Sequence, residues 1–296
     1  MKLLSLLFLI LLSTAVLAQE PVLLNDFTSS GASTFSFDPE IEGITTDNQF
    51  FFVADDGKNG EELWRSNGTA VGTQLLKDIN PNEEDSNIRL LTTIGNTVYF
   101  AAYSPEFGFE LWTTQGTTSS TQMVKDLNPG PQGGMSTTYA VLNDVLYFAG
   151  NGDKGRELYR SEGTEASTLL VRDINPNVTG SGLPFSSNLR NFTVAQDIIY
   201  FTANDGENGQ ELWRTDGTSA GTVMIVDITN GAGSTNFGQF KAVGNTLIFT
   251  ADNGINGTEL WATTGSLLTT AMLKDITEGE EGSVIEILEL VNNVLY

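Results

Sequence analysis

Short runs of apolar and β-branched residues alternate with polar turn segments along most of this chain. Residues 89–94, 97–102, 109–114 and 121–127 form one such set, and each run is rich in Thr, Val, Leu or aromatic residues. Runs of this length and composition predict short β-strands rather than helices. The most helix-like stretch, residues 283–291, aligns with the first run of earlier sets, so we predict a strand there as well.

The segments between the runs carry the chemistry of tight turns. Between the first and second runs of a set the chain has Gly-Asn, Asn-Asp or Asn-Asn, which are typical of two-residue hairpins. Between the third and fourth runs, segments such as Thr-Asp-Gly-Thr at residues 215–218 supply a glycine for a turn that needs positive φ. These turns predict that each set of four runs folds as an antiparallel meander.

The set of four runs recurs along the chain, and all four tryptophans lie in one repeated phrase, Glu-Leu-Trp. The five copies of the phrase begin at Glu62, Glu110, Glu157, Glu211 and Glu259. The third copy has Tyr159 in place of tryptophan. Successive copies are 48, 47, 54 and 48 residues apart, and the Gly and Pro of residues 175–188 mark the extra length as a surface-loop insertion.

A four-stranded unit of this length has the size of a propeller blade. We therefore predict an all-β fold, a β-propeller of four-stranded antiparallel blades with five full blades and a partial terminal blade. Each small sheet needs cover on both faces, so we expect neighbouring blades to stack and the recurring tryptophan to pack between them. The predicted repeats lie near residues 34–82, 83–130, 131–177, 178–230 and 231–279.

Partial units are predicted at both ends of the repeats. Residues 22–33 resemble a fourth strand with its exit loop, and residues 280–296 supply a first strand and half of a second. A strand that stops midway exposes an unpaired edge, which natural domains avoid. We therefore predict a C-terminally truncated chain, in which the N-terminal strand would help to close the ring of the intact protein.

The first 18 residues have the pattern of a secretory signal peptide. Lys2 precedes an apolar run over residues 3–12, and small residues lead to a cleavage site after Ala18. This run is too short for a permanent membrane anchor. We predict a secreted or cell-surface protein after signal-peptide cleavage, with no membrane insertion.

Composition narrows the possible chemistry. The chain has no cysteine and no histidine, which excludes Ser-His-Asp triads and zinc or copper sites ligated by His or Cys within it. Its formal net charge is −23, which disfavours nucleic acid as a partner and suits a cation, a basic partner or simply a solvated surface. We expect a monomer that could bind an extracellular glycan or protein.

Aspartates in two kinds of loop are candidate calcium ligands. In an up-and-down blade, the loop after the second strand and the segment after the fourth strand emerge at the same edge, so their carboxylates could meet. Carboxylate and carbonyl oxygens are the ligands that Ca²⁺ takes. The candidates are Asp55, Asp56, Asp78, Asp205, Asp227, Asp252 and Asp275. Asp, Asn and Gly also simply make turns, and that alternative stays open.

The carboxylates that recur in every repeat are predicted to be structural. A catalytic group is needed once, whereas a scaffold group is needed in each blade. The set includes the five phrase glutamates and the five aspartates near the ends of the fourth strands, Asp78, Asp126, Asp173, Asp227 and Asp275. A carboxylate at a strand end can accept N–H bonds from the adjacent loop. No catalytic or cofactor-binding residue is predicted.

The phrase Glu-Leu-Trp-Arg-Thr-Asp-Gly-Thr-Ser-Ala-Gly-Thr at residues 211–222 resembles the ELWxxDGT repeat family. The resemblance covers five copies, with departures at Tyr159 and at the second Gly-Thr of copies two, three and five. It implies large secreted or cell-surface bacterial proteins with a propeller-like fold, many of which end in a type IX sorting domain. The resemblance supplies no catalytic residues.

These observations favour a non-catalytic binding or adhesion module that presents loops on one propeller face, and hence a chain that is not an enzyme. A pure structural scaffold within a larger surface protein is the first alternative. The second is a carboxylate-dependent glycosidase or lyase, because Asp and Glu are the acid–base groups that the chain has in quantity.

Overall fold

The computed structural model describes residues 43–286, 290–291 and 294–295. The predicted signal peptide at residues 1–18 and the predicted partial unit at residues 22–33 lie outside the described residues. So does part of the predicted C-terminal unit at residues 280–296.

The described chain forms five four-stranded antiparallel sheets, each a meander of consecutive strands within one predicted repeat. The first sheet holds β1 (Ile44–Thr46), β2 (Gln49–Asp55), β3 (Glu61–Ser66) and β4 (Gln74–Lys77). The second holds β5 (Arg89–Ile94), β6 (Thr97–Ser104), β7 (Gly108–Thr114) and β8 (Gln122–Lys125). The third holds β9 (Tyr139–Leu142), β10 (Val145–Gly152), β11 (Gly155–Ser161) and β12 (Leu169–Arg172). The fourth holds β13 (Arg190–Ala195), β14 (Ile198–Asn204), β15 (Gln210–Thr215) and β16 (Val223–Val226). The fifth holds β17 (Asn236–Val243), β18 (Thr246–Asp252), β19 (Thr258–Thr263) and β20 (Ala271–Lys274).

The all-β prediction is confirmed. Within the described ranges, the helical segments are two 3₁₀ turns, η1 (Thr118–Ser120) and η2 (Leu267–Thr269). No helix among these residues is long and apolar enough to cross a membrane. Of the predicted strand at residues 283–291, residues 283–286 form no strand, and β21 (Leu290–Val291) pairs with β22 (Val294–Leu295).

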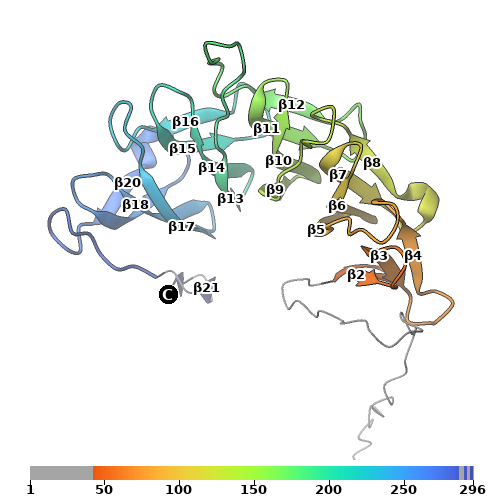
Figure 1. Ribbon diagram of the computed structural model, residues 1–296. Helices are drawn as coiled ribbons and strands as arrows, with labels where there is room; N and C mark the ends of the chain where they lie inside the picture. The colour runs from red at the N-terminus through yellow and green to blue at the C-terminus, as the bar shows by residue number, and fades with distance from the viewer. Residues whose placement is uncertain (1–42, 287–289, 292–293, 296) are drawn as a thin grey trace, which may run out of the picture.

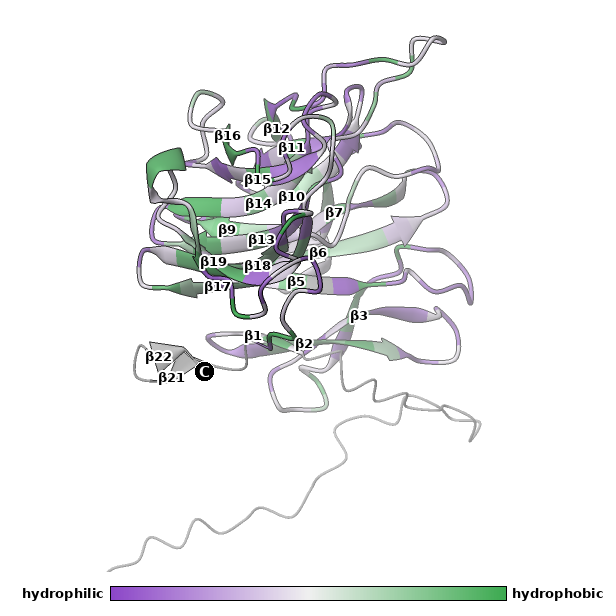
Figure 2. Ribbon diagram, turned by 90° about the vertical axis from the view of Figure 1, so that its left-hand side faces the viewer, coloured by the Kyte–Doolittle hydropathy of each residue, from purple (hydrophilic) through white to green (hydrophobic). Residues whose placement is uncertain are grey.

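The five sheets follow one another along an arc, with the first strand of each on the inner side and the fourth on the outer side (Figure 1). Inner strands of neighbouring sheets are in contact, as β9 is with β13 and β13 with β17. Hydrophobic residues lie mostly on the strands, and many hydrophilic ones lie on the loops at the two edges (Figure 2). The described residues leave the arc open between the first and fifth sheets, so a closed ring is not seen.

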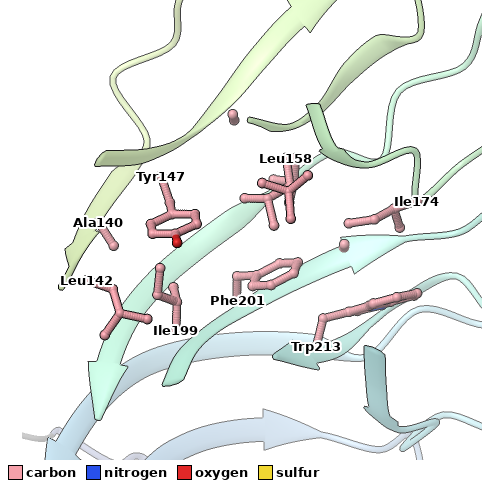
Figure 3. Close-up of a cluster of buried hydrophobic side chains, with 12 residues drawn as sticks. Ala140, Leu142, Tyr147, Leu158, Ile174, Ile199, Phe201 and Trp213 are labelled. Atoms are coloured by element: carbon pink, nitrogen blue, oxygen red, sulfur yellow. The ribbon is translucent and has the colours of Figure 1, made fainter. Parts of the chain in front are cut away.

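The hydrophobic core lies between the sheets, in four clusters that each join two neighbouring sheets. In the cluster of Figure 3, Tyr147 and Leu158 of the third sheet pack with Phe201 and Trp213 of the fourth. A tryptophan or its tyrosine replacement takes this position at the other interfaces too, as Trp112 does between the first and second sheets. The prediction that each sheet buries both faces against its sequence neighbours is confirmed for the second, third and fourth sheets, which have a neighbouring sheet on each side.

Cations reinforce these interfaces. The ammonium group of Lys77 lies 5.3 Å from the ring centroid of Trp112, and the guanidinium of Arg172 lies 5.9 Å from that of Trp213. A cation over an aromatic face is attracted by the ring quadrupole. The basic residue at the end of one fourth strand therefore binds the tryptophan of the next sheet.

A β-bulge explains why the fourth strands carry consecutive apolar residues. In the first sheet, Leu63 pairs with Lys77 and Trp64 pairs with Leu75, so Leu76 is the extra residue between them. Each of the five sheets has this register shift at the Leu-Trp or Leu-Tyr step. An extra residue in one strand shifts the register of its side chains. The fourth strand can therefore carry consecutive apolar residues and still bury Leu76.

The fifth sheet differs from the first in that the face turned away from the fourth sheet is exposed. Leu273 and Ile276 are 55% and 57% exposed, whereas the matching Leu76 and Ile79 of the first sheet are 2% and 6% exposed. At the other end of the arc, Phe50 of the first sheet is 43% exposed although its counterparts on the other second strands are fully buried. The two ends of the arc thus present apolar faces that the inner sheets bury.

Candidate functional site

The loops after each second strand and the segments that link one sheet to the next lie at the same edge of the arc, and we call this edge the loop rim. The two kinds of segment are joined by hydrogen bonds. In the first sheet the amide of Glu61 donates to Asp85 Oδ1 at 2.8 Å, and the amide of Ser86 donates to the carbonyl of Glu61 at 3.1 Å. The predicted approach of these loops is therefore observed.

The repeated glutamate lies under the rim and is fully buried in every sheet. Glu62 Oε1 accepts the amide N–H of Ile79 at 3.2 Å and of Asn80 at 3.1 Å, and it also accepts the hydroxyl of Ser86. The carboxylate thus ties the third strand of a sheet to both ends of the segment that leads to the next sheet.

The same arrangement recurs in the later sheets. A serine or threonine hydroxyl reaches the glutamate in four of the five sheets, from Ser86, Ser187, Thr235 and Ser283. Burial raises the pKa of Glu62 and of Glu157 to about 7, although the hydrogen bonds act against this rise. The repeated glutamates therefore have the structural role that their repetition predicted.

Glu110 in the second sheet departs from this pattern. Gly134 stands where the other sheets have serine or threonine, so no hydroxyl is available there. Neither carboxyl oxygen of Glu110 has a hydrogen-bond partner of normal geometry, and the amides of Leu127, Asn128 and Gly134 face it from less favourable positions. Burial raises the pKa of Glu110 to about 8, and the charge of Asp126 adds to the rise.

Glu259 in the fifth sheet differs from the other repeated glutamates in the direction of its pKa shift. Burial acts to raise its pKa, but the hydrogen bonds from Ser283 Oγ and from the amides of Ile276 and Thr277 outweigh it, and the pKa is lowered. In the first four sheets, burial instead prevails and the pKa of the glutamate is raised.

The predicted calcium ligands in the second-to-third-strand loops serve as turn acceptors. Asp55 Oδ1 accepts the amide of Gly57 at 2.7 Å, and Asp252 Oδ1 accepts that of Gly254 at 2.8 Å. Asp56 and Asp205 each accept two loop amides and the side-chain N–H of an asparagine three residues later. Their oxygens therefore close local turns.

The second set of predicted ligands comprises three strand-end aspartates, Asp78, Asp227 and Asp275. Among the described residues, Oδ1 of each is buried without a hydrogen-bond partner, and the same holds for Asp126 and Asp173, which were predicted to be structural. In the fifth sheet, Asn256 of the loop after the second strand donates to Asp275 Oδ2 at 2.7 Å, so the loop reaches the strand-end aspartate through an amide. Among the described residues, no three His, Cys, Asp or Glu side chains are grouped as a metal ion would need. Calcium binding at these residues stays a prediction.

A pocket of about 510 Å³ lies on the rim between the third and fourth sheets. The insertion after β12 supplies one wall, and the loop after β14 supplies the other. Its lining includes Asn175, Asn177, Val178, Phe185, Asn204 and Glu207. From the sequence the insertion was predicted to be a surface loop. The 54-residue interval was the signal that this part of the loop rim differs from the equivalent parts in the other repeats.

Comparison with known proteins places the fold. No protein-family model matches the chain, and no curated protein matches it. Among solved structures, the chain is similar to a post-proline cleaving enzyme from Rickettsia typhi, with a TM-score of 0.50 and 8% identity over 81% of this chain and 37% of that enzyme. A puromycin hydrolase matches with a TM-score of 0.45 and 14% identity, over 81% of this chain and 38% of that one. Identities this low show the fold alone.

This comparison corrects the functional prediction. A non-catalytic binding or adhesion module, a pure scaffold and a chain outside the enzymes were expected, but a solved structure with a similar fold is a post-proline cleaving enzyme. The physical reason for the error is that the absence of His and Cys excludes a triad inside the repeats and says nothing of residues elsewhere. This chain spans less than two fifths of the length of either hydrolase.

Proposed function

We propose that the chain is most of a closed β-propeller of the ELWxxDGT repeat kind, exported through its signal peptide. The apolar faces at the two ends of the arc support closure, because Leu273 and Ile276 at one end and Phe50 at the other would be covered by one further blade. Closure would also remove the exposed edges that an open stack of sheets leaves.

We further propose that this propeller is the non-reacting part of an exported hydrolase that acts on peptides. The observation that carries the proposal is the likeness to the post-proline cleaving enzyme over 37% of that enzyme's length. The chain has no histidine or cysteine to activate a nucleophile, and four of its five repeated glutamates accept hydrogen bonds from the segments between sheets. The reacting groups would therefore lie outside the repeats.

Activity of the complete gene product tests this proposal. The complete product is expected to cleave chromogenic dipeptide substrates and to be labelled by a fluorophosphonate probe, whereas the present chain alone does neither. A complete product that leaves both a peptide library and the probe unchanged would overturn the hydrolase proposal. N-terminal sequencing of the exported protein checks the leader, with Gln19 expected as the first residue.

A further inference from the structure

One wall of the pocket between the third and fourth sheets is formed by the insertion after β12. Within the insertion, the amide of Phe185 donates to the carbonyl of Asn177 at 3.0 Å, and the amide of Thr179 donates to that of Leu183 at 2.8 Å. Val178 and Pro184 also form a β-bridge. These bonds order the insertion, from which Val178 and Phe185 both line the pocket with exposed side chains.

Three asparagines supply the polar part of the pocket. Asn175 and Asn177 come from the insertion and Asn204 from the end of β14. In the described part of the chain, none of their three side-chain NH₂ groups has a hydrogen-bond partner of its own. The carbonyl oxygen of Asn204 accepts the amide of Gly206 at 2.7 Å, which fixes its side chain. Such a set offers donors to carbonyl groups of a ligand.

Gly206 permits the asparagines to lie this close to the opposite wall. A Cβ atom at this position would lie 2.2 Å from Asn177 Nδ2 and 2.7 Å from Asn175 Oδ1. The residue also has a φ of +85°, which favours glycine. The two walls are therefore matched to each other.

The charge of the pocket is negative. Glu207 is the one charged residue in its lining, and the chain as a whole carries a formal charge of −23. No lysine or arginine is among the lining residues to attract an anion. A ligand that combines carbonyl acceptors, an apolar group and a cation would meet every kind of group that lines this pocket.

We propose that this pocket binds peptide segments in which an apolar residue is next to lysine or arginine. The asparagine NH₂ groups donate to the peptide carbonyls, Val178 and Phe185 contact the apolar side chain, and Glu207 pairs with the cation. The inference rests on the proposed function and deepens it, because it names cationic peptides as the class of substrate. It places a recognition site on the propeller, separate from the reacting groups.

Isothermal titration of the chain with the acetylated, amidated tetrapeptide Ala-Leu-Lys-Ala tests the inference. We expect saturable binding at one site, and no binding of Ala-Leu-Glu-Ala. Glu207→Gln should weaken the lysine peptide by roughly two- to five-fold, as expected for an exposed ion pair. Phe185→Ser should weaken it by roughly ten-fold, the effect of losing an apolar anchor. Binding of maltotetraose in place of the peptide, or equal binding of the two peptides, would overturn the proposal.

Two matched variants keep the test specific. Leu268→Ser removes a 97% exposed apolar side chain in η2, at the opposite edge of the fifth sheet, and Glu165→Gln removes an exposed carboxylate from a turn of the third. Both should bind the lysine peptide as the parent does, and weakening equal to that of Phe185→Ser or Glu207→Gln would contradict a site in the pocket. Because binding is measured without turnover, it separates the two proposals. A peptide that binds as described to a protein without hydrolase activity sinks the proposed function alone.

Discussion

At the scale of single residues, the repeats show how one position changes the hydrogen bonding of a buried acid. A hydroxyl group reaches the buried glutamate in four sheets, and Gly134 removes it in the second. A buried carboxylate without donors is costly, so the neutral form is favoured. Burial raises the pKa of Glu110 to about 8.

Glu110→Gln tests this at two pH values. Because the folded pKa of Glu110 lies above its ordinary value, its contribution to stability is present at low pH and is lost as pH rises toward 8 and beyond. Glutamine mimics the neutral acid, so the variant should match the parent at pH 5. It should unfold roughly 5 °C higher than the parent at pH 9. Thermal melts followed by circular dichroism measure this difference, and Glu106→Gln, which removes an exposed charge, should show none.

Glycine is required at position 134 because there is no room for a Cβ atom. A Cβ atom there would lie 2.4 Å from Leu127 Cβ and 2.9 Å from the carbonyl oxygen of Asn151. Gly134→Ala should therefore lower the free energy of unfolding by about 1–3 kcal/mol, the usual cost of overpacking. Chemical denaturation gives this value. Gly180→Ala is the control, because nothing lies within 4 Å of its added carbon, and an equal loss there would refute the steric argument.

At the scale of elements, the turn between the third and fourth strands explains most of the repeated phrase. In the fourth sheet, Asp216 Oδ1 accepts the amide and the hydroxyl of Thr218, and the hydroxyls of Thr215 and Thr222 lie 2.7 Å apart. Gly217 has a φ of +91°, as its place in the turn predicted. The motif is therefore a structural turn.

The departures from the motif follow a rule within this turn. Where the second glycine is present, as at Gly221, a Cβ atom would lie 2.1 Å from Asp216 Oδ1. Where serine replaces it, as at Ser120, the hydroxyl accepts the amides of Gln115 and Thr117 instead. When the first residue of the turn is Asn or Asp, the later position is therefore glycine. When the first residue is of another type, the later position carries a hydroxyl group.

A double-mutant cycle tests the rule in the fourth sheet. Gly221→Ser and Asp216→Gln should each destabilise the protein by about 1 kcal/mol, through a clash and through lost hydrogen bonds respectively. The double variant has the pair found in the second sheet and should recover at least half of the summed loss. Urea denaturation of the four proteins measures the coupling, and strict additivity would mean that the two positions are independent.

The strands could be predicted from the sequence because each has a local pattern of apolar residues and turn residues. The run at residues 89–94 coincides with β5, and Asn143 and Asp144 have the positive φ values that a hairpin dipeptide predicts. The bulge at Leu76 and the pocket beside the insertion were missed. Both depend on which residues of distant segments meet, and no local pattern encodes that. The prediction of a non-catalytic module was wrong for another reason, since composition describes only the groups in this chain.

At the scale of the whole molecule, the open arc makes a direct prediction about its ends. If a further blade closes the ring in solution, Ile276 is buried there as Ile79 is, and Ile276→Ser and Ile79→Ser should each cost about 2–4 kcal/mol of stability. Ile255→Ser, at a 69% exposed loop position, should cost little. Loss of stability at Ile79 together with none at Ile276 would show that the ring stays open.

The sharing of every hydrophobic cluster by two sheets has a consequence for cooperativity. A single sheet has no interior of its own, so the smallest autonomous folding unit is a pair of adjacent repeats. Removing one internal repeat at equivalent positions would join two compatible surfaces and preserve a shorter array. Cutting through the middle of a repeat would strip the partner from the interface on either side.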